Sequence, residues 1–434
     1  MGNDLQMTAG FARLDITPPM GTYVRGYFRE RRVKGVFDPL HVRAVAFGCG
    51  EKSAVLLVAE LCALSGLSGS RWPEELARRL GLPREAVFLC CTHTHTGPDV
   101  TTERSDPEYD AWLLRRLGDA AQMALDERRP VTDVRWTQGE QPGQAFVRRY
   151  FMKDGTLVTN PKNASPDIDC PASEGDDSFR LIRILRQDAG EIALVNFQNH
   201  PDCIGGELIS ADWPGSLCAT VERECDVRCV FVNGTQGDLN NNNKLLPKVP
   251  ASHEKAMALG TELGRAVAAV FDQAESTGMT GLNYAMGTVQ LRTKRDPSKV
   301  PESRRIVELF RAGRTEEIHP TLKMANYLYC EASQLCRLED GQLDTVTADI
   351  QVLAFGGLAL AGFPGEPFSE VGKYVRANSP FPATCACCLT GNSLGYFPME
   401  SDFALGGYEV YNTPLSAGTT EQMMYLARDL LAEL

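Results

Sequence analysis

The sequence lacks an excess of positive charge, a long apolar run and an abundance of histidine. In 434 residues, 44 Lys and Arg stand against 56 Asp and Glu, a formal net charge of −12. So acidic a chain does not suit general nucleic-acid binding, which depends on neutralising phosphates. The longest apolar stretch, residues 352–363, is too short and too rich in glycine to span a bilayer. We therefore expect neither a nucleic-acid partner nor membrane insertion.

Two further absences concern processing and cysteine chemistry. The N-terminus has no basic segment followed by an apolar segment, which a secretory signal peptide requires. The 14 cysteines form no repeated CxxC pairs at zinc-finger spacing, and disulfide frameworks belong to small secreted chains. We therefore expect reduced thiols, most of them packed in the core as small hydrophobes, and a cytoplasmic location.

The remaining composition is that of an ordinary soluble globular protein, with 43% hydrophobic and 23% charged residues. Strand-like runs alternate with helix-like runs along the chain, which predicts an α/β fold with a central sheet. The predicted strands are residues 42–47, 53–58, 86–91, 192–197, 227–232, 349–355 and 358–362, and the predicted helices are 73–80, 109–128 and 253–274. Segments 161–178 and 292–304 are expected to be surface loops.

Polar side chains follow several of these strands, and ligands in α/β folds bind outside the carboxyl ends of strands. The side chains expected to converge there are His93, His200, Asp238 and Glu366. His93 and His95 belong to the segment THTHTGP, and alternate residues of an extended chain face the same side. Neutral imidazole is a good zinc ligand, although an isolated HxH pattern is more often two partly exposed histidines at a strand end.

His200 strengthens the metal hypothesis, because three of the six histidines then occupy strand-end positions. Glu366 and Tyr396 are less informative by themselves. A lone loop glutamate is usually a solvated charge, and a lone tyrosine is usually a half-buried aromatic residue. Composition and spacing alone therefore leave the chemistry open.

An ordered set of short segments resembles the catalytic domain of the neutral/alkaline, non-lysosomal ceramidase family. These segments are residues 16–21, 25–27, 38–40, 92–98, 199–201, 237–238, 364–366 and 407–409. The resemblance implies a large single α/β domain over residues 1–434, with a central mixed sheet flanked by helices. It also leads us to expect that the C-terminal immunoglobulin-like domain of ceramidases is missing.

The resemblance implies one zinc ion held by two histidines, a glutamate and a tyrosine. The matching positions are His93, His200, Glu366 and Tyr396. In that family a second tyrosine lies twelve residues beyond the ligand tyrosine. Tyr408 has this spacing here, since 408 − 396 = 12.

The same resemblance implies roles for residues around the metal and shows one departure. His95 matches a histidine that contacts the substrate or its oxyanion, and Arg148 is a looser match to a substrate-contacting arginine, with Arg149 as the alternative. Asn240 stands where ceramidases have a serine proposed as the nucleophile. Because asparagine is no nucleophile for acyl transfer, we expect attack by zinc-activated water, with Tyr408 and His95 stabilising the oxyanion.

Several polar residues near these segments keep more than one interpretation. Asp238 either orients a ligand histidine or caps its own turn, and Asp212 has no identifiable task. Asn242 is a further candidate for a hydrogen bond to substrate or water. The cysteines closest to these segments fit core packing better than thiol catalysis, without a settled role: Cys90, Cys91, Cys203, Cys385, Cys387 and Cys388.

These observations predict a zinc-dependent hydrolase that cleaves an amide bond of a small intracellular N-acyl substrate. A zinc esterase or lactonase needs the same residues and is one alternative. A non-catalytic ligand-binding relative, inactive since the serine was lost, is the other. The sequence fixes neither the substrate nor the oligomeric state.

Overall fold

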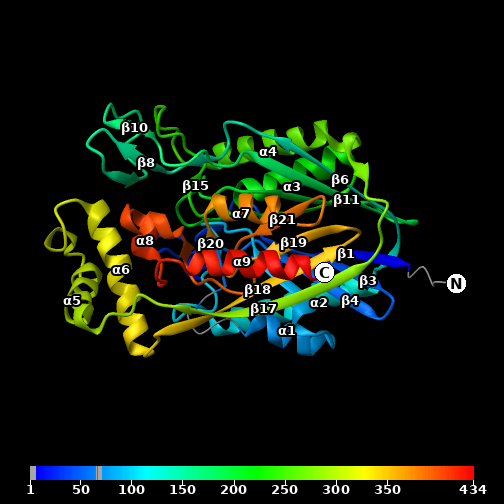
Figure 1. Cartoon of the computed structure of the whole chain (residues 1–434), viewed down its shortest axis with the longest axis horizontal. Helices are drawn as coiled ribbons and strands as arrows, with labels where there is room; N and C mark the ends of the chain where they lie inside the picture. The colour runs from blue at the N-terminus through cyan, green and yellow to red at the C-terminus, as the bar shows by residue number, and fades with distance from the viewer. Residues whose placement is uncertain (1–5, 65, 67–70) are drawn as a thin grey trace.

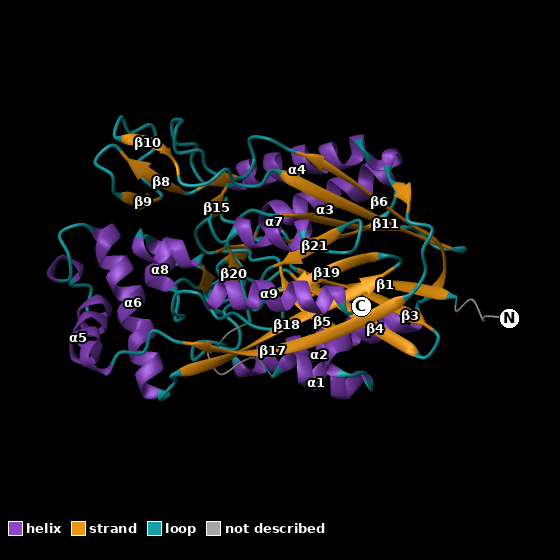
Figure 2. Ribbon diagram, viewed as in Figure 1, coloured by secondary structure: helices purple, strands orange, loops and turns teal. Residues whose placement is uncertain are grey.

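Two β-sheets packed face to face form the centre of the computed structural model, with helices on both outer faces (Figures 1 and 2). The structure describes residues 6–64, 66 and 71–434. Each buried strand presents alternate side chains to opposite faces, so one strand supplies two layers of core. In the fourth strand, for example, Val55 and Leu57 face the helices, whereas Leu56 and Val58 face the second sheet.

The larger sheet has the strand order β14-β12-β11-β6-β1-β3-β4-β5, with β16 (Glu275–Ser276) beside β6. Its bounds are β1 (Met7–Asp15), β3 (His41–Cys49), β4 (Lys52–Ala59), β5 (Val87–Cys91), β6 (Arg129–Glu140), β11 (Ser178–Arg186), β12 (Ile192–Phe197) and β14 (Arg228–Asn233). Most neighbours are antiparallel, but β4–β5 and β12–β14 are parallel. The mixed α/β sheet predicted from the sequence is confirmed.

Four long helices cover the outer face of this sheet. They are α1 (Trp72–Leu80), α2 (Pro107–Asp126), α3 (Asp212–Cys225) and α4 (His253–Ala269). Asp106 caps α2 by accepting from two backbone amides of its first turn, and Ser252 caps α4 in the same way with one. The apolar faces of α1 and α2 pack on β3–β5, and those of α3 and α4 pack on β11–β14.

The second sheet is a difference from the single central sheet predicted. It contains β17 (Leu282–Arg292), β18 (Thr345–Phe355), β19 (Leu358–Gly362) and β21 (Thr384–Cys387). Its inner face packs on the larger sheet, where the rings of Phe47 and Phe355 stack with centroids 4.4 Å apart. Helices α7 (Ser369–Ala377) and α9 (Thr419–Ala432) cover its outer face. Because β18 and β19 are buried on both faces, their apolar runs carry no alternation that would reveal a second layer.

A further group of strands and helices lies together at one end of the molecule, away from both termini (Figure 1). It contains β8 (Arg149–Met152), β9 (Leu157–Thr159), β10 (Ile168–Pro171), α5 (Val300–Arg311), α6 (Leu322–Asp340) and α8 (Tyr408–Asn412). The prediction that 161–178 and 292–304 are plain loops is wrong, because they include β10 and the start of α5. Helix α5 has Pro301 in its first turn, a position that proline is compatible with.

Most of the thiols lie in the core. Of the 14 cysteines, ten are buried and only Cys170 is exposed. Cys90 and Cys91 point to opposite faces of β5, toward the second sheet and the outer helices respectively. Across the described part of the chain, no helix combines the length and the apolar character needed to cross a membrane.

Candidate functional site

The predicted metal ligands meet where two strands of the larger sheet end beside a short two-stranded ladder. His93 lies two residues beyond the end of β5, and His200 lies three residues beyond the end of β12. Glu366 and Tyr396 are paired in register in a short parallel ladder between β20 (Glu366–Pro367) and β22 (Tyr396–Phe397). The ladder places the carboxylate and the phenol side by side although thirty residues separate them (396 − 366 = 30).

The donor atoms of these four residues converge in the buried interior. Glu366 Oε2 lies 3.2 Å from His93 Nε2 and 3.3 Å from His200 Nε2, and the Tyr396 hydroxyl lies 3.4 Å from His200 Nε2. Ligand atoms of His93, His200 and Glu366 all lie within 4.8 Å of one another. None of the four side chains is more than 9% exposed.

Both imidazoles are oriented by backbone carbonyl oxygens. His93 Nδ1 donates to the Cys62 carbonyl at 2.8 Å, and His200 Nδ1 donates to the Leu239 carbonyl at 2.8 Å. A carbonyl only accepts hydrogen bonds, so each Nδ1 carries a proton. Each Nε2 therefore faces Glu366, in the tautomer and orientation that metal-bound histidines adopt.

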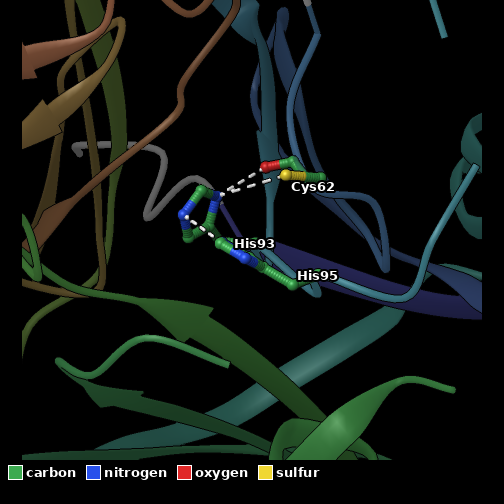
Figure 3. Close-up of side chains that lie close together, drawn as sticks. All are labelled: Cys62, His93 and His95. Carbon is green, nitrogen blue, oxygen red and sulfur yellow. Dashed lines mark hydrogen bonds between the residues drawn. The ribbon is translucent and has the colours of Figure 1, made fainter. Parts of the chain in front are cut away.

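Cys62, His93 and His95 form a second group that is close enough to hold a metal (Figure 3). The Cys62 thiol lies 3.8 Å from His93 Nδ1, but that nitrogen already donates to the carbonyl oxygen of the same cysteine. A metal on this side would have to break that hydrogen bond. The group with His200 and Glu366 needs no such change and is the better metal centre.

The backbone at His93 differs from the extended chain assumed in the sequence argument. Strand β5 ends at Cys91, and His93 has φ of 77°, in the left-handed region. A non-glycine residue pays about 1–2 kcal/mol for this conformation. The His93 amide donates to the Leu61 carbonyl at 2.8 Å, which holds the turn. His93 and His95 still meet, with 3.1 Å between their Nε2 atoms, but through this turn and not through strand alternation.

Burial and mutual charge determine the protonation of the cluster. Burial opposes ionisation of Glu366, but the charge on His93 and hydrogen bonds from both histidines hold its pKa well below the usual range. Burial also opposes a charge on His93, yet the Glu366 carboxylate raises its pKa well above the ordinary value. Burial and the Arg148 charge lower the pKa of His200 to about 3. Without a metal, the cluster is therefore an ion pair beside a neutral imidazole.

Arg148, and not the alternative Arg149, reaches this cluster. Its Nη1 lies 3.1 Å from His200 Nε2, and its guanidinium lies 5.0 Å from the Tyr396 ring centroid. Arg149 instead binds Asp402 and the Gly406 carbonyl. One further residue beside Arg148 had no role in the sequence argument, although it lies in the resembling segment 407–409.

That residue is Glu409, which is fully buried. It accepts from Arg148 Nε at 2.7 Å and from Thr159 Oγ1 at 2.8 Å. A buried guanidinium requires such a partner. Glu409 therefore fixes Arg148 beside the candidate metal ligands.

Tyr408 and Asn240 border the cluster in different ways. The Tyr408 ring lies 5.5 Å from the Tyr396 ring, and its hydroxyl accepts from Asn412 at 2.9 Å. Asn240 ends β15 (Leu239–Asn240), one residue beyond the carbonyl that orients His200. Among the described residues, its half-buried side chain has no hydrogen-bond partner. Asn242, in contrast, is engaged by the Asn163 amide at 3.1 Å.

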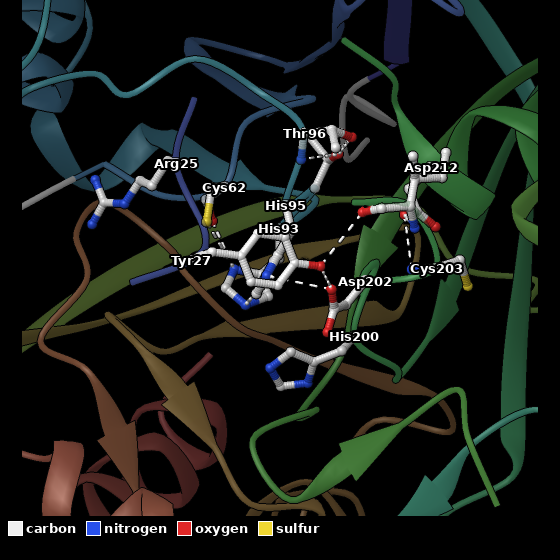
Figure 4. A network of polar contacts seen from close by, with 12 residues as sticks. Arg25, Tyr27, Cys62, His93, His95, Thr96, His200, Asp202, Cys203 and Asp212 are labelled. Atoms are coloured by element: carbon white, nitrogen blue, oxygen red, sulfur yellow. Dashed lines mark hydrogen bonds and ion pairs between the residues drawn. The ribbon is translucent and has the colours of Figure 1, made fainter. Parts of the chain in front are cut away.

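His95 faces a tyrosine–carboxylate pair that the sequence argument missed (Figure 4). The Tyr27 hydroxyl donates to Asp202, and His95 Nδ1 lies 3.8 Å from the same carboxylate. The Tyr27 and His95 rings meet edge to face, 5.5 Å apart. Gly26 permits this approach, because its φ is 114° and a Cβ there would lie 2.8 Å from the His95 ring.

Two other carboxylates anchor backbone next to the cluster. Asp238 accepts from the Ser369 amide at 2.7 Å and its hydroxyl at 3.0 Å, at the first turn of α7. Asp212 accepts from the Cys203 and Ile204 amides at 3.0 and 3.1 Å, in the loop after His200. Both hold loops that carry candidate ligands.

The thiols near the cluster are in an environment that opposes reactivity. Cys385, Cys387 and Cys388 are fully buried, and burial raises the pKa of Cys385 to about 11. Burial likewise raises the pKa of Cys203 well above the usual range. Because the thiolate is the nucleophile, these environments favour core packing over thiol catalysis.

The donor set fits zinc. Two oriented imidazoles and a carboxylate are a common ligand set of catalytic zinc sites, which leave room for substrate or water. The phenol oxygen of Tyr396 is the fourth candidate ligand beside them. Arg148 Nη2 is a buried hydrogen-bond donor without a hydrogen-bond partner among the described residues. Fold and site together define an α/β protein whose buried strand-end residues His93, His200 and Glu366 could hold a metal ion.

Comparison with solved structures identifies the fold more closely. The chain is similar to neutral ceramidase from Pseudomonas aeruginosa, with a TM-score of 0.71, 17% identity, and coverage of 99% of this chain and 74% of that one. It is also similar to a ceramidase complexed with C2, with a TM-score of 0.72, 15% identity, and coverage of 99% and 75%. No family model and no curated protein sequence matches the chain. The protein thus has the neutral ceramidase fold.

Proposed function

We propose that the protein is a zinc-dependent hydrolase that cleaves an amide bond of a small N-acyl substrate. One observation carries the proposal: the convergence of the donor atoms of His93, His200, Glu366 and Tyr396 at buried strand ends. The chain shares its fold with two ceramidases, which are amide hydrolases, and this likeness supports the same reaction class. The cytoplasmic location expected from the abundant cysteine belongs to this proposal.

The four converging residues would hold the ion. Zinc in such a site lowers the pKa of water to about 7 and polarises a carbonyl group. The chain itself must then position the acyl group and stabilise the negative charge that develops on its oxygen. Oxyanion stabilisation of this kind contributes about a hundred-fold or more in rate.

Tyr408 is suited to that task. Burial raises its pKa well above the ordinary value, so the phenol keeps its proton. The hydroxyl oxygen accepts from Asn412, and its hydrogen, which lies beside the Cys330 thiol, would turn to a substrate oxygen. His95 is the second donor, and burial with the neighbouring His93 lowers its pKa, which keeps it neutral. Its Nδ1 is buried without a hydrogen-bond partner among the described residues.

Asn240 would bind substrate or water, without forming a covalent bond. We expect Asn240→Ala to lower kcat/KM by about tenfold, the worth of one hydrogen bond to a reacting group. Steady-state kinetics on one amide substrate will measure the loss, which must be smaller than that of a ligand variant. Mass spectrometry of quenched reactions is the control. A trapped acyl adduct on the protein would contradict attack by water.

Amide and ester hydrolysis can be distinguished by parallel assays of an amide and its matched ester. We expect the protein to hydrolyse an N-acyl amide, and we expect the rate to fall in the His93→Ala variant. The rate of hydrolysis of the matched ester should fall in the same variant. Parallel assays of the two acyl compounds measure both. Turnover of the ester or a lactone with none of the amide would assign the protein as an esterase.

The replacement of the ceramidase serine by Asn240 favours one further candidate, a ligand-binding protein without activity. Isothermal titration that detects binding of N-acyl compounds, together with no turnover of any amide or ester in a broad panel, would favour that candidate. Hydrolysis that depends on His93 would exclude it.

A further inference from the structure

Three partly buried lysines near the metal centre have no carboxylate partner. They are Lys244, which is 8% exposed, and the half-buried Lys255 and Lys323. No Asp or Glu of the described chain lies within 4.0 Å of their ammonium groups. In a chain with 56 acidic residues and a net charge of −12, this shortage of counter-charge is local and specific.

Each ammonium group instead contacts a neutral oxygen. Lys244 Nζ lies 3.4 Å from Asn163 Oδ1, and Lys255 Nζ lies 2.6 Å from Asn241 Oδ1. Lys323 Nζ, on α6, donates to the Asn160 carbonyl at 3.0 Å. Neutral oxygens satisfy hydrogen bonds but supply no counter-charge at contact distance, which is costly for buried groups.

The lysines are attached to the residues that build the metal centre. Asn241, the partner of Lys255, also donates to the His200 carbonyl at 3.3 Å. The Asn160 amide, in the loop that accepts from Lys323, donates to the Arg148 carbonyl at 2.6 Å. The cluster of Lys244, Lys255 and Lys323 thus borders the same site as Arg148 and His200.

The charges act on one another. Burial, together with the charges of Lys248 and Lys255 and against the opposing charge of Asp202, lowers the pKa of Lys244 to about 8. Burial lowers the pKa of Lys323 to about 8, and Lys244 is the next cause. A bound anion would relieve both the desolvation and the mutual repulsion.

Two buried polar atoms at this border have no partner among the described residues. Arg148 Nη2 is an unpaired donor on a side chain that is 4% exposed, and Asn160 Oδ1 is an unpaired acceptor. Buried polar atoms are nearly always paired in native proteins, so unpaired ones point to a ligand. A ligand that met both would also lie beside the lysine cluster.

We propose that the cluster of Lys244, Lys255 and Lys323 binds an anionic group, a carboxylate or a phosphate, on the substrate. The inference rests on the proposed function, because the amide bond of the same molecule would lie at the His93–His200–Glu366 centre. It assigns the substrate to the class of acidic N-acyl compounds. A neutral lipid would leave three partly desolvated charges unpaired.

Binding of matched probes tests the proposal without turnover. N-acetylglycine carries a carboxylate, the phosphate ester of N-acetylethanolamine carries a phosphate, and N-acetylethanolamine is the neutral reference. We expect the native protein to bind one of the two anionic probes at least about tenfold more tightly than the neutral one, the worth of one charge-assisted hydrogen bond. Whichever anion binds more tightly identifies the group.

The variant pair Lys244→Gln with Lys323→Gln removes two charges and keeps a donor at each position. It should lose the preference for the anion while its affinity for the neutral probe stays unchanged. Lys153→Gln, at an exposed position outside the set of charges that shift the pKa values of Lys244 and Lys323, is the matched control and should keep the preference. If the double variant fails to fold, as judged by circular dichroism, Lys323→Gln alone is expected to weaken binding of the anionic probe by several-fold.

Three results would overturn the inference: equal binding of neutral and anionic probes, no binding of either anion, or an equal loss in Lys153→Gln. The outcome is separate from that of the proposed function. Hydrolysis of neutral amides without an anion preference would refute the inference alone. Selective anion binding by a protein that hydrolyses no amide would refute the function and leave the anion site in place.

Discussion

Replacing His200 with alanine is expected to abolish tight zinc binding and to lower amide turnover more than about a hundred-fold. Removing a residue that merely supports a metal ligand costs about 10–100-fold in affinity or activity, so removing a ligand itself costs more. His200 Nε2 lies 3.3 Å from Glu366 Oε2, and the ring is held by the Leu239 carbonyl. Elemental analysis of the purified variant and a kinetic assay measure the two losses, and His93→Ala should behave alike.

A histidine outside the cluster provides the control. His319 lies before α6, where its Nδ1 contacts the Thr321 hydroxyl at 3.0 Å. His319→Ala should keep both the metal content and the turnover of the native protein. Full zinc occupancy in both His93→Ala and His200→Ala would refute the ligand assignment.

Replacing Glu409 with alanine is expected to destabilise the fold by about 3–5 kcal/mol. This is the range for removing one partner of a buried ion pair, because the remaining charge is left in a low-dielectric interior. The carboxylate is 0% exposed and accepts from Arg148 and Thr159, with Arg149 Nε 3.5 Å away. Urea unfolding followed by circular dichroism gives the change in the free energy of unfolding.

An exposed ion pair serves as the matched comparison. Glu74 contacts Arg84 at 3.0 Å, with the carboxylate side chain 53% exposed. Glu74→Ala should cost less than about 1 kcal/mol, as is usual for surface pairs. A change of similar size in Glu409→Ala would show that Glu409 does not balance the charge on Arg148.

The sequence predicted the parts of the fold that rest on local pattern. The runs that became β3, β4, β5, β12 and β14 are apolar and short, and each begins and ends within a few residues of its prediction. The strand-end positions of His93 and His200 followed from them. The second sheet was missed although the strands 349–355 and 358–362 were predicted, because local pattern does not show which strands pair with one another.

The site was predictable where a residue type has a narrow chemical use and unpredictable where long-range contacts decide. Imidazoles at strand ends raised the metal hypothesis, and the family resemblance supplied the full ligand set. Glu409 gained its role only through contacts with Arg148 and Thr159, which lie 261 and 250 residues away. Asp202 beside His95 and the unpaired Lys244 belong to the same class. No local pattern distinguishes such buried charges from solvated ones.

The most direct test of the central claim, a metal-dependent amide hydrolase, is an assay of the same protein before and after metal removal. Protein stripped with a chelator and dialysed should hydrolyse an acidic N-acyl amide at a negligible rate. Adding back about one equivalent of zinc per chain should restore the activity, because His93, His200, Glu366 and Tyr396 would hold one ion. Undiminished hydrolysis by protein shown to be metal-free would contradict the account.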